Sequence, residues 1–362
     1  MATERAGGRL IAGRYRLEEL LGSGGMGVVW SATDQLLGRR VAVKEIPQDD
    51  SLSLPADEAR ARRDRTLREA RAVAQLRHPH IIVVHDVVED DEHPYMVMEL
   101  IDGPSLAERI ADHGPVDPHE AARIGIALLG ALRSAHEAGV LHRDLKPANV
   151  LIESGTGRVV LTDFGVAHVE GASTLTEAGS FVGSAEYTAP ERMAGGGTGP
   201  ASDLWSLGVL LCTAVSGRSP FQRDTLSGVL LAVVSADIRF PAQAEPLLPV
   251  VRGLLERDPE RRLDAVRAER LLRDFRETGR TTPTPPTESS RRARRAARER
   301  LALALLVAAL AGAGMSAALL LMSGEGDDGG RTPTTPAPRT SLTTPGTPSV
   351  HAPGGTSAPA PR

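Results

Sequence analysis

One stretch of the sequence constrains this chain more than any other, because it carries three short polar motifs in a fixed order. They are Leu141–Val150 (LHRDLKPANV), Asp163–Gly165 (DFG) and Ala189–Glu191 (APE). Taken singly, Asp144 or Asn149 would be read as a loop residue that turns or caps the backbone. The conjunction of two carboxylates, an amide and a lysine in this order is too specific for that reading.

These motifs resemble those of the eukaryotic-type protein kinases. The lysine at position 146 resembles the pattern of the serine/threonine-specific branch. Phosphoryl transfer needs metal ions near the phosphates and a carboxylate near the attacking hydroxyl. The resemblance implies that Asp144 is the catalytic base, that Lys146 places positive charge beside the γ-phosphoryl group, and that Asn149 and Asp163 hold Mg²⁺. It also implies an α+β bilobal fold, with a small β-rich N-lobe, a larger helical C-lobe and ATP between them.

A glycine-rich segment precedes these motifs, at Gly22–Gly27. The dinucleotide-binding fold uses the same G-x-G-x-x-G letters but places a helix directly after the glycines. Here the following residues, Val28–Trp30 and Val41–Val43, are β-branched or apolar and indicate strands. We therefore expect a glycine-rich hairpin over phosphates, where a Cβ would keep backbone N–H groups away from the phosphate oxygens.

Lys44 ends a strand that reads as buried, so an anion should face it. The resemblance implies that Lys44 binds the α/β-phosphates and pairs with Glu69. Glu69 lies on a predicted helix with Leu67, Ala70 and Val73 at helical spacing. It further implies that Glu99–Ile101 is the hinge that reads adenine. The full implied ATP site is Leu21, Gly22, Ser23, Gly24, Gly25, Met26, Gly27, Val29, Ala42, Lys44, Met98, Glu99 and Ile101.

Further roles are carried by the resemblance. Arg143 would receive a phosphate on the activation segment, with Thr176 and then Thr174 as the sites of autophosphorylation in trans. Asp203 would brace the catalytic loop, and Ser202 or Asp203 is also suited to cap the helix that begins there. Arg262 would form an ion pair with Glu191, the alternative being a surface arginine.

Composition and periodicity predict the domain organisation. The expected segments are a flexible leader (1–13), a kinase domain (14–276, with the N-lobe to about 100 and the C-lobe from about 104), a Thr/Pro-rich and polybasic juxtamembrane linker (277–300), a transmembrane helix (301–322) and a disordered Pro/Thr-rich tail (323–362). Before residue 100 we expect five strands and one helix, with Pro47–Ala61 as a loop. From Pro118 the apolar spacing predicts a helix that ends at Gly139.

Leu301–Met322 contains no charged residue and is long enough to cross the hydrocarbon core of a bilayer. Arg291–Arg300 precedes it and acidic residues follow, so the positive-inside rule predicts a single-pass cell-membrane protein with a cytoplasmic kinase domain and an extracellular tail. The arginines should also bind anionic lipid. Small residues at every fourth position from Ala304 to Ser316 favour a homodimer, although an alanine-rich run produces such stripes by chance.

The remaining composition narrows the alternatives. A net charge of −4 gives no drive towards nucleic acid, and the single cysteine, Cys212, lies in an apolar run that predicts a buried thiol. We expect protein substrates, ATP and Mg²⁺. The rival hypothesis is a pseudokinase scaffold that binds nucleotide and partners without turnover, which would predict loss of Lys44, Asp144 or Asp163; all three are present.

Overall fold

The computed structural model describes residues 8–24, 27–47, 56–91, 93–165, 185–195 and 197–280. The expected linker, membrane helix and tail lie outside these residues, as do Thr174 and Thr176. Within the described ranges, no helix combines the length and the apolar character needed to cross a bilayer.

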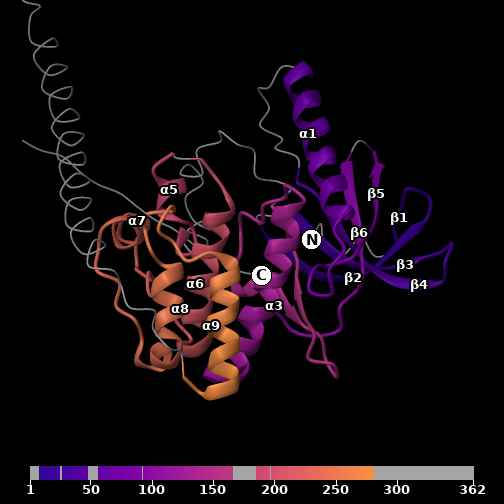
Figure 1. Cartoon of the computed structure of the whole chain (residues 1–362). Helices are drawn as coiled ribbons and strands as arrows, with labels where there is room; N and C mark the ends of the chain where they lie inside the picture. Colours follow the sequence, from indigo (N-terminus) through magenta and orange to yellow (C-terminus); the bar gives the residue numbers. More distant parts are fainter. Residues whose placement is uncertain are drawn as a thin grey trace, which may run out of the picture. The chain divides into compact units, whose positions relative to one another are not determined.

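The N-lobe is one antiparallel sheet with a long helix beside it (Figure 1). The strand order is β1-β2-β3-β4-β6-β5. The elements are β1 (Leu10–Ile11), β2 (Tyr15–Gly24), β3 (Gly27–Asp34), β4 (Arg39–Glu45), α1 (Ala56–Ala74), β5 (Val84–Asp90) and β6 (His93–Met98). The β2–β3 hairpin closes with Gly24 opposite Gly27, which is where the sequence predicted the glycine-rich hairpin.

Two N-lobe predictions were wrong at element boundaries. Residues 8–13 are not a leader, because β1 pairs with β2 and Ile11 is fully buried in a small apolar cluster with Tyr15 and Leu17. The helix begins at Ala56, so it includes part of the loop expected at Pro47–Ala61. Alanine and arginine are strong helix formers, and they extend α1 beyond the residues that pack on the sheet.

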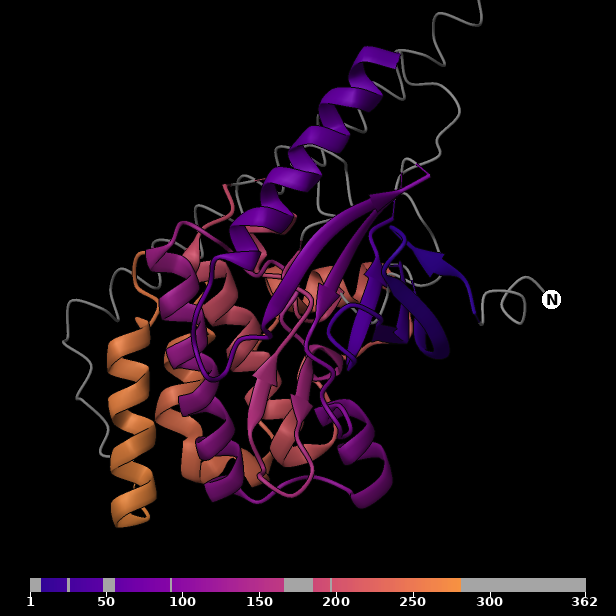
Figure 2. The same ribbon diagram turned by 90° about the vertical axis from the view of Figure 1, so that its right-hand side faces the viewer.

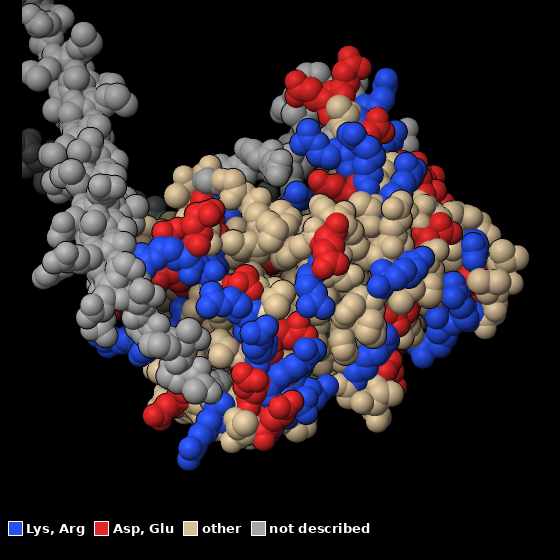
Figure 3. Space-filling view, in the orientation of Figure 1, with Lys and Arg blue, Asp and Glu red and all other residues tan. Residues whose placement is uncertain are grey.

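Among the described side chains of α1, the buried ones lie in its second half. Leu67, Ala70 and Val73 are buried, whereas the described side chains before Leu67 are exposed or half-exposed. Figure 2 shows this first half reaching past the sheet, and Figure 3 shows acidic and basic side chains gathered on it. The buried half therefore fixes the position of α1, and Glu69 lies within it.

The C-lobe is helical, with a short hairpin facing the sheet. Its elements are α2 (Leu106–His113), α3 (Pro118–Glu137), η2 (Pro147–Asn149), β7 (Val150–Ile152), β8 (Val159–Leu161), α5 (Pro190–Met193), α6 (Pro200–Ser216), α7 (Leu226–Val234), η3 (Ala242–Leu247), α8 (Leu248–Leu254) and α9 (Ala265–Thr278). Asp117 caps α3 by accepting from the backbone N–H groups of His119 and Glu120.

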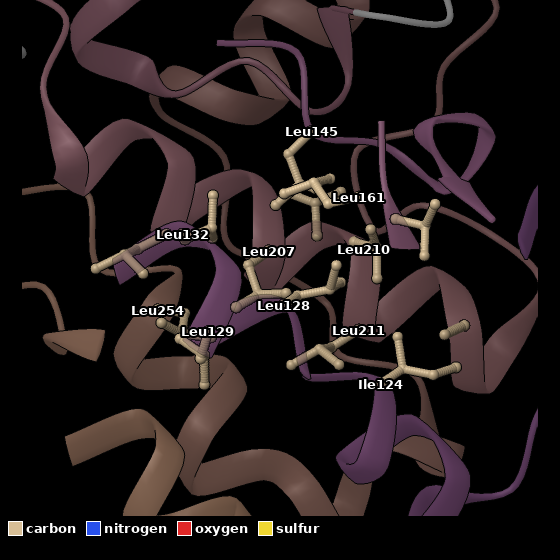
Figure 4. Close-up of a cluster of buried hydrophobic side chains, with 14 of the residues drawn as sticks. Ile124, Leu128, Leu129, Leu132, Leu145, Leu161, Leu207, Leu210, Leu211 and Leu254 are labelled. Atoms are coloured by element: carbon tan, nitrogen blue, oxygen red, sulfur yellow. The ribbon is translucent and has the colours of Figure 1, made fainter. Parts of the chain in front are cut away.

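The largest apolar cluster of the described chain lies where α3 and α6 meet. Figure 4 shows Leu128 and Leu129 of α3 together with Leu207 and Leu211 of α6. Every side chain of α6 from Ser202 to Val215 is buried, and burial raises the pKa of Cys212 to about 12. This helix is a rigid base for the loops above it.

The predicted cap of α6 was wrong. The N-cap is Gly199, followed by Pro200 in the first turn, and no side chain caps the helix. Ser202 instead donates to Glu191, at 2.8 Å, and Asp203 accepts from the backbone of residues 142 and 143. Pro200 has no backbone N–H, so the first turn of α6 has one donor fewer to satisfy. Ser202 and Asp203 make tertiary contacts instead of capping the helix.

Candidate active site

The catalytic loop places its polar side chains around one carboxylate. Asn149 Nδ2 donates to both the backbone oxygen and Oδ2 of Asp144, at 2.7 and 2.8 Å. Lys146 Nζ lies 2.9 Å from the same Oδ2. Asp144 is 7% exposed, so its carboxylate is oriented before any substrate arrives.

Asp203 supports this loop from beneath. Its carboxylate accepts from the backbone N–H groups of His142 and Arg143, at 2.9 and 2.8 Å, and from His136 Nε2, at 2.8 Å. Burial alone would raise the pKa of Asp203, but the hydrogen bond from His136 and the charges and backbone N–H around it hold that pKa below its ordinary value. The contacts maintain Arg143 in the left-handed region, at a φ of 67°, which a non-glycine residue seldom adopts.

The DFG segment is tied to the catalytic loop through backbone contacts. The Thr162 N–H donates to the Asn149 oxygen at 3.0 Å, and the Thr162 oxygen accepts from His142 Nε2 at 2.8 Å. The His142 and Phe164 rings lie 4.8 Å apart. His142 is fully buried, as expected for a packed structural residue. The contacts of Thr162 place the next residue, Asp163, beside the catalytic loop.

The pairing of Lys44 differs from what the resemblance implied. Lys44 Nζ lies 2.7 Å from Asp163 Oδ1, whereas Glu69 Oε1 lies 3.5 Å from Arg143. Among the described contacts Lys44 and Glu69 do not meet. A half-buried lysine requires an anion, and here the carboxylate of the neighbouring DFG segment supplies it, while the nearby Arg143 guanidinium holds Glu69. The expected Lys44–Glu69 pair is therefore wrong for this arrangement.

Four residues of the expected ATP site, Val29, Ala42, Met98 and Ile101, belong to one separate apolar cluster. Its buried members are Ala42, Ile82, Met98, Ile101 and Val160, with Val29, Leu100 and Leu151 packed against them. The sequence reasoning missed Leu151, although an apolar residue on the strand directly after Asn149 was the available signal. Within the described chain, the backbones of Leu100 and Ile101 make no hydrogen bond, so they can pair with the edge of a planar ring.

The glycine-rich hairpin combines one crowded position with two open ones. Gly27 has a φ of 106°, and a Cβ there would lie 2.2 Å from the Glu45 oxygen. A Cβ at Gly22 or Gly24 would meet no other atom within 4 Å, so the backbone at these two positions faces open space. Leu21 and Ser23 are exposed on β2, and Gly25 and Met26 lie outside the described residues. The hairpin can therefore bring backbone N–H groups close to an anion.

Arg262 and Glu191 form a bidentate ion pair, with nitrogen–oxygen distances of 2.8 and 2.9 Å. The Arg262 side chain is 1% exposed and stacks over Trp205. Burial would raise the pKa of Glu191, but Arg262 and Ser202 hold it below its ordinary value. The pair joins the APE segment to the end of the C-lobe, in the place that the resemblance implied.

The donor set fits a hard cation such as Mg²⁺. Asn149 donates through Nδ2 to Asp144, which leaves its amide oxygen as an acceptor, and Asp163 adds a carboxylate oxygen. In the part of the chain that the structure describes, no group of three or more His, Cys, Asp or Glu side chains could hold a metal ion. Phosphate oxygens and water would complete such a coordination shell.

Comparison with known proteins places these features in a family. The protein kinase domain model matches residues 15–272. The chain is 41% identical over 256 residues to the serine/threonine-protein kinase PknA of Mycobacterium tuberculosis, covering 69% of this chain and 57% of PknA.

Two further relatives agree. The serine/threonine-protein kinase PrkC of Bacillus subtilis is 36% identical over 242 residues, covering 67% of this chain and 36% of PrkC. The serine/threonine-protein kinase PknL of Mycobacterium tuberculosis is 38% identical over 229 residues, covering 63% and 56%. The chain thus matches little more than half of PknA and PknL and about a third of PrkC. By these matches and by the site they surround, the chain belongs to the protein kinase family, in its bacterial serine/threonine branch.

Proposed function

We propose that this chain transfers the γ-phosphoryl group of ATP to serine and threonine hydroxyls of protein substrates. The observation that carries the proposal is the arrangement around Asp144, whose carboxylate is held by Asn149 and Lys146 beside Asp163. A positioned base, a cation for the transferring group and oxygen ligands for a metal are what phosphoryl transfer requires.

In the proposed reaction, the substrate hydroxyl oxygen forms a bond to the γ-phosphorus while the bond to the β-γ bridging oxygen breaks and ADP leaves. Asp144 accepts the hydroxyl proton, and Lys146 stabilises the negative charge of the transferring group. Lys44 exchanges its contact with Asp163 for the α/β-phosphates. Mg²⁺ held by Asn149 and Asp163 would neutralise charge on the phosphate oxygens.

We further propose regulation by autophosphorylation in trans, at Thr176 or Thr174. Arg143 supports this proposal, since an arginine beside the catalytic carboxylate provides a planar, permanently charged partner for phosphate. In the structure Arg143 contacts Glu69, so a phosphate would compete with that carboxylate for the guanidinium.

The membrane proposal rests on the sequence. Leu301–Met322 would span the bilayer once and Arg291–Arg300 would contact anionic headgroups on the cytoplasmic side. The kinase domain would then lie in the cytoplasm and the Pro/Thr-rich tail outside. The small-residue stripe of the helix would support a homodimer in the membrane.

The test uses the full chain purified in detergent and incubated with Mg²⁺ and γ-labelled ATP. We expect label on serine or threonine, and Asp144→Asn should reduce the rate by at least about a hundredfold because proton transfer loses its base. Asp112→Asn, an exposed residue of α2, is the matched control and should label like the parent.

The outcomes separate the two hypotheses. Equal labelling of the parent and Asp144→Asn would contradict the assigned base. Nucleotide binding without labelling in any variant would favour the pseudokinase scaffold. A phosphopeptide map without label in residues 166–184 would contradict Thr176 and Thr174 as the regulatory sites.

A further inference from the structure

Both carboxylate oxygens of Glu99 accept hydrogen bonds. Glu99 directly follows β6 and is the first residue of the segment expected to face adenine, Glu99–Ile101. Its Oε1 accepts from the Val83 N–H at 2.9 Å, and its Oε2 accepts from Arg158 Nη2 at 2.7 Å. The Glu99 N–H in turn donates to the Val83 oxygen at 2.9 Å. Three hydrogen bonds therefore fix the start of this segment.

Arg158 comes from the turn between β7 and β8, on the C-lobe. Its guanidinium also contacts Glu153 at 3.2 Å, within the same turn, and the Pro79 oxygen at 3.5 Å. The Arg158 and Glu99 side chains are 27% and 20% exposed, so the pair is partly shielded from water. Arginine suits such a site, because its planar fork serves several acceptors at once.

The β7–β8 hairpin, which carries Arg158, also holds the chain just after the adenine-facing segment. The Ser154 N–H donates to the Asp102 oxygen at 2.7 Å, and the Ile152 N–H donates to the Pro104 oxygen at 2.9 Å. A Cβ at Gly103 would lie 2.0 Å from the Ile152 oxygen, so the two backbones are in close contact. Between these anchors, Leu100 and Ile101 keep unpaired backbone groups within the described chain.

The hairpin also carries the nucleotide-facing residues of the C-lobe. Leu151 of β7 and Val160 of β8 belong to the apolar cluster with Met98 and Ile101. Asn149 directly precedes β7, and Asp163 follows β8 by two residues. One hairpin thus sets both the adenine-facing segment and the residues proposed to hold the metal.

We propose that Arg158 is a positioning residue that sets nucleotide affinity through Glu99. The inference rests on the proposed ATP-dependent function and extends it to a residue outside the motifs. With Arg158 removed, Leu100 and Ile101 must be ordered when the nucleotide binds, which weakens ATP binding in the ground state and the transition state equally. The KM for ATP should therefore rise while kcat stays unchanged.

The experiment compares Arg158→Gln with Arg123→Gln in the full chain. Arg123 is the matched control, since it donates to the Gly157 oxygen of the same turn and to Glu120 but does not contact Glu99. We expect Arg158→Gln to raise the KM for ATP and the Kd for ADP about fivefold, equal to about 1 kcal/mol, with kcat unchanged. Arg123→Gln should leave all three values at the parent level, and Arg158→Lys should recover part of the affinity.

A double-mutant cycle with Glu99→Gln identifies the route. If Arg158 acts through Glu99, the double variant should be no weaker than the weaker single variant. Fully additive effects would overturn the proposed route. Unchanged KM and Kd in Arg158→Gln, or equal losses in Arg123→Gln, would overturn the positioning role.

The ADP titration keeps this inference separate from the proposed function. It is measured by calorimetry in the presence of Mg²⁺ and requires no turnover. A parent chain that binds ADP but labels no serine or threonine would contradict the kinase activity, while the ratio of Kd values would still decide the role of Arg158.

Discussion

Asp203 shows how one buried carboxylate can define a loop. It accepts from two consecutive backbone N–H groups and from His136, and it is 1% exposed. An uncharged substitute of the same shape would turn one oxygen into a donor that faces donors. That loss is more severe than loss of a surface carboxylate, because no water can replace the missing acceptor.

We therefore predict that Asp203→Asn lowers the free energy of unfolding by about 2–4 kcal/mol and abolishes labelling. Urea unfolding followed by circular dichroism measures the first effect, and the labelling assay measures the second. Asp112→Asn is again the control and should unfold at the parent midpoint. A stable Asp203→Asn variant with parent activity would contradict the role assigned to this carboxylate.

The ion pair between Arg14 and Asp34 should make the stability of the N-lobe depend on pH. Arg14 donates to both carboxylate oxygens of Asp34 at 2.8 Å, and this contact lowers the pKa of Asp34 from 3.8 to about 2. Because the folded pKa is depressed, the stabilisation is present above about pH 4 and is lost as the pH falls towards 2. Asp34→Asn should be less stable than the parent at pH 7, and this difference should shrink between pH 4 and pH 2. A constant difference in urea unfolding across that range would contradict the prediction.

At the scale of elements, β1 is the clearest difference between expectation and structure. A two-residue strand has too few positions for an alternating pattern, so its pairing with β2 leaves no signal in the sequence. Its contribution lies in one side chain, because Ile11 is fully buried and its neighbour Leu10 is 41% exposed.

We predict that Ile11→Ala lowers the free energy of unfolding by about 2–4 kcal/mol, through lost burial and the cavity left behind. Leu10→Ala, on the same strand, should change it by less than about 0.5 kcal/mol. Urea unfolding of both variants measures the difference. Equal effects would mean that β1 adds no specific packing.

Long periodic elements were predictable, and the resemblance anticipated the Arg262–Glu191 ion pair, but the pairing of Lys44 was not predictable. The spacing from Pro118 anticipated α3, which ends at Glu137 shortly before Gly139, and the bilobal α+β fold is confirmed. The partner of Lys44 could not be read from the sequence, because Glu69 and Asp163 are both carboxylates and only three-dimensional distance selects between them. Arg158 lies outside the motifs, so local pattern gave it no role, whereas the position of Leu151 directly after the catalytic loop was a usable signal.

At the scale of the whole molecule, the described chain accounts for the kinase domain but not for its location. The described residues belong to one compact unit, which contains the catalytic loop, the DFG segment and the residues around Met98. The membrane proposal concerns residues beyond this unit, so it can be tested without altering the site.

We predict that the full chain floats with lipid vesicles in a density gradient, whereas a chain ending at Thr284 remains at the bottom. A chain ending at Ser323, which keeps the apolar segment and loses the tail, should float like the full chain. Vesicles with anionic lipid should retain more protein than neutral ones, because of the arginines at 291–300. Flotation of the shortest chain, or none of the full chain, would contradict the proposal.

The burial of Cys212 has a practical consequence. It is the only cysteine of the chain. Its thiol is buried in the apolar cluster around α6, and burial keeps it protonated at ordinary pH. The native protein is thus a ready background for maleimide dyes, with no cysteine to remove first. Dyes at Arg65→Cys on α1 and Asp112→Cys on α2 would let single-molecule energy transfer follow the helix that carries Glu69 as nucleotide is added.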